Sequence, residues 1–125
     1  MRALFLMPLL IAVPAAVPAQ PAASTVDVQL TSFDFTPSQI RLRAGQPIVL
    51  RLTNAGRGGH NFSAPQFFAA ARIASGQNLI RNGAIEVPSR QTVTVQLTPA
   101  RGSYRLRCTH TLHTTFGMRG QIVVS

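Results

Sequence analysis

The sequence is poor in several residue types, and each shortage excludes a class of protein. It has one cysteine, so no internal disulfide can form and a disulfide-stapled miniprotein is excluded. It has only three acidic residues, Asp27, Asp34 and Glu86, and this scarcity argues against general acid–base catalysis. It has no lysine, so its 12 basic residues are all arginine and the net charge is +9. With 125 residues, the chain has room for one domain.

The sequence also lacks an apolar run long enough to span a bilayer comfortably. The longest, residues 3–13, is short and is interrupted by Pro8. A positively charged start precedes it, and small residues and prolines follow it as far as Ala19. This three-part pattern predicts a secretory signal peptide over residues 1–19, with an uncleaved membrane anchor as the alternative. We therefore expect a periplasmic or secreted protein, without stable membrane insertion after cleavage, that begins with a flexible lead-in over residues 20–25.

Residues 26–125 are expected to form the folded domain, and most of this region has the pattern of short strands. Apolar and polar residues alternate, between turn residues, at 26–30, 40–43, 48–53, 84–87, 93–97, 104–108 and 121–124. In the sixth of these segments, Leu106 and Cys108 share one face, and Arg105 and Arg107 share the other. Short runs of period two at this spacing predict an all-β sandwich or barrel.

One alanine-rich segment departs from the strand pattern. Pro65 suits the first turn of a helix, Ser63 suits the N-cap position, and Phe68 and Ala71 are at helical spacing. These residues predict one short helix within residues 64–75.

The residues that can bind a metal fall in two places. His60 follows a glycine-rich loop, whereas His110 and His113 lie close to Cys108, with Met118 five residues after His113. A thiolate, imidazoles and a thioether form a soft ligand set that favours copper, and two His, one Cys and a weak axial Met are the blue-copper arrangement. Zinc is the main rival, but a thioether is a poor zinc ligand. A cysteine that only packs in the core is the remaining alternative.

Several segments, taken together, resemble the cupredoxins, the family of small blue-copper proteins. The resemblance covers nearly all of the chain after residue 19 and is carried by Phe35–Ile40, Ala44–Gly45, Asn54–Gly56, His60–Phe62, Gly102–Tyr104, Cys108, His113 and Gly117–Gly120. The spacings of five residues from Cys to His and from His to Met resemble those of rusticyanin-like members. The resemblance implies a cupredoxin-like Greek-key β-sandwich or barrel, here with one short inserted helix.

Position by position, the resemblance also implies a site for one type 1 copper ion. His60, Cys108 and His113 would be the equatorial ligands and Met118 the axial ligand. Asn61 would join the two ligand loops by hydrogen bonds, the kind of contact that orients metal ligands.

The histidine that follows the cysteine is open to an alternative. His110 supplies an extra imidazole, but it is only two residues from Cys108, whereas His113 keeps the family's register with Met118. The resemblance also implies that His113 lies near the surface beside Phe116, which would give electrons a short apolar exit.

The resemblance implies a non-enzymatic, monomeric copper protein that transfers single electrons between redox partners. There are two alternatives. One is a copper carrier or storage module, and the other is an interaction domain whose metal site is empty. The basic charge is either a solvated surface or a means of steering toward an acidic redox partner. We expect no nucleic-acid partner, because the chain is exported and its arginines are scattered along the sequence, at 41, 43, 51, 101, 105 and 107.

Overall fold

The computed structural model describes residues 1–5, 7–16, 22–110 and 117–125. Residues 1–5 and 7–16 contain neither helix nor strand, and their large apolar side chains are exposed. Within the described ranges, no helix is both long enough and apolar enough to cross a membrane. The assignment of residues 1–19 to a signal peptide therefore stays a prediction.

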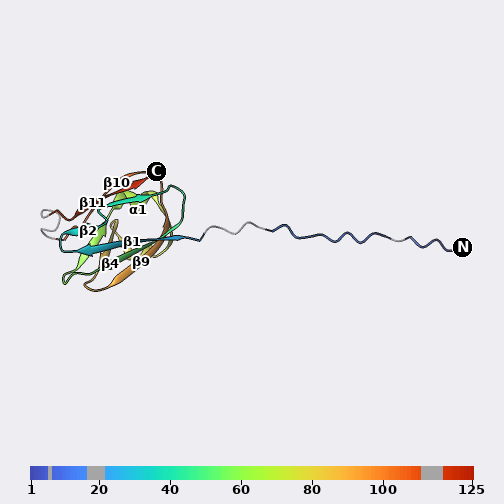
Figure 1. Ribbon diagram of the computed structural model, residues 1–125, viewed down its shortest axis with the longest axis horizontal. Helices are drawn as coiled ribbons and strands as arrows, with labels where there is room; N and C mark the ends of the chain where they lie inside the picture. Colours follow the sequence, from blue (N-terminus) through green and yellow to red (C-terminus); the bar gives the residue numbers. More distant parts are fainter. Residues whose placement is uncertain (6, 17–21, 111–116) are drawn as a thin grey trace.

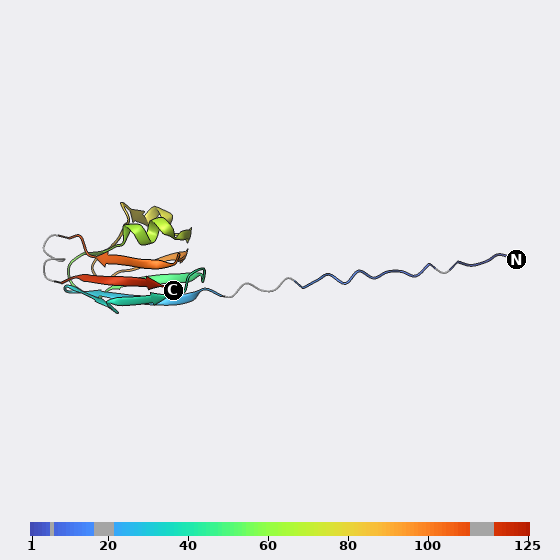
Figure 2. The ribbon, with the colours of Figure 1, turned by 90° about the horizontal axis from the view of Figure 1, so that it is seen from above.

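The folded part of the chain is a sandwich of two sheets, as Figures 1 and 2 show from two directions. Among the described residues, five strands form sheet A, in the order β2 (Asp34–Thr36), β1 (Ser24–Thr31), β4 (Ile48–Asn54), β9 (Thr92–Thr98) and β6 (Arg72–Ser75). Six strands form sheet B, in the order β3 (Gln39–Leu42), β11 (Arg119–Val124), β10 (Gly102–Arg107), β5 (His60–Ser63), β8 (Ala84–Val87) and β7 (Ile80–Arg81). β1 begins at Ser24, inside the segment assigned to the lead-in.

The apolar residues that alternate along these strands fill the space between the two sheets. In β4, for example, Ile48, Leu50 and Leu52 are buried, and β10 buries Leu106 while Arg105 is exposed. Burying one such side chain contributes roughly 1.5–3 kcal/mol, so the alternation itself supplies much of the driving force for the sandwich. The predicted all-β fold is therefore confirmed.

The short helix predicted within residues 64–75 is present in the first half of that segment. α1 spans Pro65–Ala70, and Ala71 already has an extended backbone. The following residues form β6, which pairs with β9 at the edge of sheet A, where Ile73 packs against the core. The predicted short helix is therefore confirmed, whereas the strand that follows it was not predicted, because pairing with the sheet edge outweighs the helical preference of the alanines.

The predicted N-cap was wrong. Ser63 is the last residue of β5, and Ala64, which makes no side-chain capping bond, occupies the N-cap position. Pro65 does lie in the first turn, as expected.

A 3-10 turn at Gln77–Leu79 then leads to β7. Figure 2 shows α1 (yellow-green) on one side of the strands, and it is held there by Phe67, whose ring centroid is 5.5 Å from that of Tyr104.

Candidate metal centre

Three of the four predicted copper ligands lie at one end of sheet B. His60 is the first residue of β5, Cys108 directly follows β10, and Met118 directly precedes β11. β10 is antiparallel to both neighbours, with Arg107 paired to Ser63 on one side and to Arg119 on the other. The start of β5, the end of β10 and the start of β11 therefore meet at the same edge of the sandwich.

The same three side chains point toward the core rather than toward solvent. His60 lies two residues before the core residue Phe62, and its exposed fraction is 4%, while Cys108 and Met118 are both at 0%. The Cys108 N–H donates to the Met118 carbonyl oxygen at 3.1 Å, which extends the β10–β11 pairing by one step. The thiol and the thioether therefore lie on facing residues of one antiparallel pair, on the inner side.

Asn61 joins the strand that carries His60 to the segment that carries Cys108, as predicted. Its Nδ2 donates to Thr109 Oγ1 at 2.6 Å, and its Oδ1 accepts from the Thr109 N–H at 2.8 Å. The Asn61 backbone N–H donates to Cys108 Sγ at 3.5 Å. One residue thus fixes the position of the sulfur and of the chain beside it.

The glycine-rich loop before His60 is held by Asn54, a role that the sequence analysis missed. Asn54 is fully buried, and its Nδ2 donates to the carbonyl oxygens of Gly58 and Val87 at 2.8 and 2.9 Å. Its Oδ1 accepts from the Gly56 N–H at 2.8 Å, an Asx turn. An asparagine directly before a glycine-rich stretch is the sequence signal that indicates such a turn.

This loop lies against one edge of the His60 ring. A methyl group on Gly56 would be 3.4 Å from His60 Nε2 and 3.3 Å from Asn54 Oδ1. A side chain at position 56 would therefore be in contact with the imidazole and would be tight against Asn54 Oδ1.

His110 is engaged on a different side. Its Nε2 lies 2.9 Å from Glu86 Oε2, and the other carboxylate oxygen, Oε1, accepts from Asn61 Nδ2 at 3.0 Å. The Glu86 side chain is 65% exposed and that of His110 is 33% exposed. This contact commits one ring nitrogen of His110 to a carboxylate, a contact that the sequence analysis did not foresee.

The remaining expectations for this end of the sandwich concern His113 and Phe116, which lie outside the described residues. Within the part of the chain that is described, no three His, Cys, Asp or Glu side chains come together as a metal-binding group. Of the four predicted ligands, the described residues include His60, Cys108 and Met118. Because methionine is not one of the four residue types just named, only two of these three ligands count toward such a group.

The donor atoms that do meet here suit a soft metal ion. A buried thiol, an imidazole and a thioether are the donors that copper selects, and the Asn61 backbone N–H that donates to Cys108 Sγ holds the sulfur in place. The residues present therefore fit a copper ion better than zinc or a hard cation such as magnesium.

Comparisons with known proteins agree with this fold. No curated protein sequence matches the chain. Among solved structures, one similar chain is an auracyanin from the photosynthetic bacterium Roseiflexus castenholzii, with 18% identity, a TM-score of 0.61, and coverage of 84% of this chain and 99% of that one. Auracyanin B has 20% identity and a TM-score of 0.60, with coverage of 87% of this chain and 93% of that one. Auracyanin A, a blue copper protein from Chloroflexus aurantiacus, has 21% identity and a TM-score of 0.56, with coverage of 82% of this chain and 100% of that one. At these identities the likeness establishes the cupredoxin fold. The sequence profile of the cupredoxin-like domain matches residues 2–124, and the chain therefore belongs to that family.

Proposed function

We propose that this chain is an exported protein that binds one type 1 copper ion and transfers single electrons between redox partners. The observation that carries the proposal is the meeting of His60, Cys108 and Met118 at one buried end of sheet B. The similarity to auracyanin A, which is described as a blue copper protein, supports it.

We assign the ion to His60, Cys108, His113 and Met118. The rusticyanin-like spacings of five residues support His113, and so does the contact that commits His110 Nε2 to Glu86. Copper bound there supplies a one-electron couple between Cu(II) and Cu(I).

The protein's own contribution is a pocket that holds its shape. Three of the four assigned side chains are buried, which excludes water from around the sulfur atoms. Asn61 links the two ligand segments, and the Cys108 N–H links Cys108 to Met118. Ligands held by such contacts move little when the charge of the site changes, and little rearrangement is what fast electron transfer requires.

The predicted signal peptide supports a location in the periplasm or outside the cell. The net charge of +9 supports a redox partner with an acidic surface, because opposite charges accelerate the encounter of two proteins. None of these roles requires the chain to act as an enzyme.

The decisive experiment is to add Cu(II) to the purified full chain and record its visible spectrum. We expect an intense thiolate-to-copper charge-transfer band that is lost in Cys108→Ser and in His113→Gln, and retained in the matched variant His110→Gln. Met118→Leu should shift the band or the potential. Absence of the band from the unchanged chain would rule out the copper site.

A second measurement separates an electron carrier from a copper carrier or storage module. Reversible and rapid reduction and reoxidation with the copper retained supports electron transfer. Ready loss of copper to a chelator, together with slow redox cycling, would support the carrier role instead.

A further inference from the structure

Sheet B turns a cluster of arginines toward solvent. Arg41 on β3, Arg105 and Arg107 on β10, and Arg119 on β11 are all exposed, and we call these four residues the arginine face. Each alternates with buried residues of its strand, so all four belong to the side of sheet B that is turned away from the core.

The register of the strands is what brings these residues together. Arg107 is the direct partner of Arg119, and Arg105 follows on the same side of β10, roughly 7 Å along the strand. Arg41 is the partner of Val123 in the parallel pair of β3 and β11, four residues along β11 from Arg119, so it lies at the far end of the face. The interpretation of the arginines as scattered was therefore wrong for Arg105, Arg107 and Arg119, because it ignored the pairing between strands.

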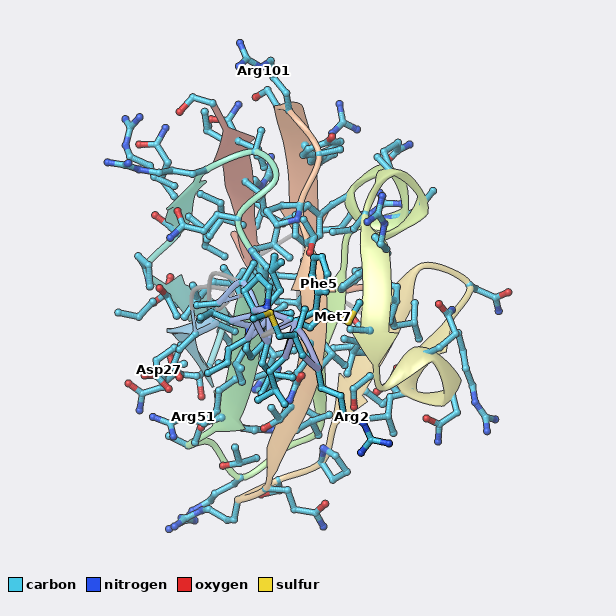
Figure 3. The ribbon with its side chains drawn as sticks, turned by 90° about the vertical axis from the view of Figure 1, so that its right-hand side faces the viewer. Arg2, Phe5, Met7, Asp27, Arg51 and Arg101 are labelled. Carbon is cyan, nitrogen blue, oxygen red and sulfur yellow. The ribbon has the colours of Figure 1, made fainter. Side chains whose placement is uncertain are left out.

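Few acidic groups are in a position to neutralise this face. Asp27 is bound by Arg51 on sheet A, where Figure 3 shows the two side chains together, and Asp34 lies on β2 in the same sheet. Both carboxylate oxygens of Glu86 already have partners. The C-terminal carboxylate follows Val124, at the opposite end of β11 from Arg119 and at the end near Arg41, so the part of the face that lies away from this carboxylate is Arg105, Arg107 and Arg119.

The surface around Arg105 and Arg107 is hollowed on both sides. A hollow of about 640 Å³ extends over β10 and β11, and a second of about 410 Å³ extends from β10 toward Gln66 at the start of α1. Among the described residues, neither hollow has a carboxylate in its lining, whereas Ser103, Gln121 and Gln66 add polar groups to the arginines.

Such a surface is complementary to carboxylates. Arg107 and Arg119 face each other across the β10–β11 pair, so a carboxylate bound between them would be close to two guanidinium groups. The planar guanidinium binds a carboxylate with two parallel hydrogen bonds. Each of the two hollows can receive one acidic side chain of an extended segment. A partner with a flat charged surface would not enter them, so the extended segment suits this face better.

The arginine face also adjoins the candidate metal centre. Arg107 directly precedes Cys108, and Arg119 directly follows Met118. A partner bound over these two arginines would therefore lie beside the backbone that leads to both sulfur ligands.

We propose that the arginine face is the docking surface for an acidic segment of a partner protein. The description of that protein as a redox partner rests on the proposed electron-transfer function, whereas the binding of an acidic segment does not. The two proposals can therefore fail separately.

The test is a titration of the full, copper-free chain with a fluorescein-labelled decaglutamate peptide at low salt, followed by anisotropy. Arg105→Gln/Arg107→Gln should weaken binding by about three- to tenfold, the range expected for two exposed charge pairs. Arg41→Gln/Arg119→Gln, in the same face, should weaken it similarly. The matched control Arg72→Gln/Arg81→Gln removes two exposed arginines from β6 and β7 and has the same net charge, and it should change binding less than twofold.

Two outcomes would overturn the proposal. Equal weakening in the test and control variants would mean that net charge alone attracts the peptide. Binding to phosphatidylglycerol vesicles that depends on Arg105 and Arg107, without such dependence for the peptide, would assign the face to a lipid surface. The titration uses the copper-free chain, so neither outcome tests the copper site. Conversely, failure to see the copper charge-transfer band would not change the result of the peptide titration.

Discussion

The replacement of Asn61 by alanine tests the connection between the two ligand segments most directly. The change removes three side-chain hydrogen bonds, two with Thr109 and one with Glu86. It keeps the backbone N–H that donates to Cys108 Sγ and keeps all four assigned ligands. The variant should therefore still bind copper, but with a cysteine that is held less firmly.

The magnitude follows from the three bonds. A typical intramolecular hydrogen bond contributes about 1 kcal/mol, and the bond to the largely exposed Glu86 adds no more than that because solvent screens it. Since Asn61 is only 3% exposed, part of the desolvation of its partners stays uncompensated. We expect the free energy of unfolding to fall by about 2–4 kcal/mol, which lowers the urea midpoint by about 1–2 M.

The assay is urea unfolding of the copper-free chain, followed by measurement of the reduction potential with copper bound. The potential should shift, because hydrogen bonding around the cysteine sulfur tunes it. Asn78→Ala, in the exposed 3-10 turn, is the control and should alter stability by less than about 0.5 kcal/mol. An unchanged midpoint together with an unchanged potential would refute the role assigned to Asn61.

Three further predictions concern other parts of the sandwich. Asn54→Ala should lower the free energy of unfolding by about 2–4 kcal/mol, because three hydrogen bonds of a fully buried side chain are lost, and a normal thermal midpoint would contradict this. Gly120→Ala should cost about 1–3 kcal/mol, since the new methyl group would approach the Ser38 carbonyl oxygen on the neighbouring strand segment; wild-type stability would show that the strands can separate. The Arg51 guanidinium holds the pKa of Asp27 below its ordinary 3.8, so their ion pair stabilises the fold above that pH and is lost as pH falls through the lowered pKa. Asp27→Asn should therefore lower the urea midpoint slightly at about pH 7 and not at about pH 2, and an equal effect at both would contradict it.

The strands were predictable from the sequence because alternation and burial coincide. β4 and β10 each place their apolar side chains on one face, and that face is the one the sandwich buries. The segment after α1 was not predictable in this way, since alanine is a good helix former and the edge of β9 that captures Ile73 is not visible in the local sequence.

The candidate site divides in the same manner. The positions of His60, Cys108 and Met118 at one edge follow from motifs that sit at strand ends. The contact between His110 and Glu86 joins residues 24 positions apart, and the pairing of Arg107 with Arg119 depends on a register that composition does not specify. Contacts between residues on different strands can be predicted only when the order and register of the strands are known.

The two sulfur-bearing residues of the candidate site belong to a single hairpin, whereas His60 comes from a strand nearly fifty positions earlier. Pairing within a hairpin takes microseconds, and pairing between distant strands is slower. During refolding, we therefore expect thiol and thioether to become neighbours before any imidazole from β5 joins them. A soft monovalent ion such as Cu(I) would then meet a two-sulfur chelate on the nascent chain, and accelerated refolding of the wild type but not of Cys108→Ser in its presence would reveal that order of assembly.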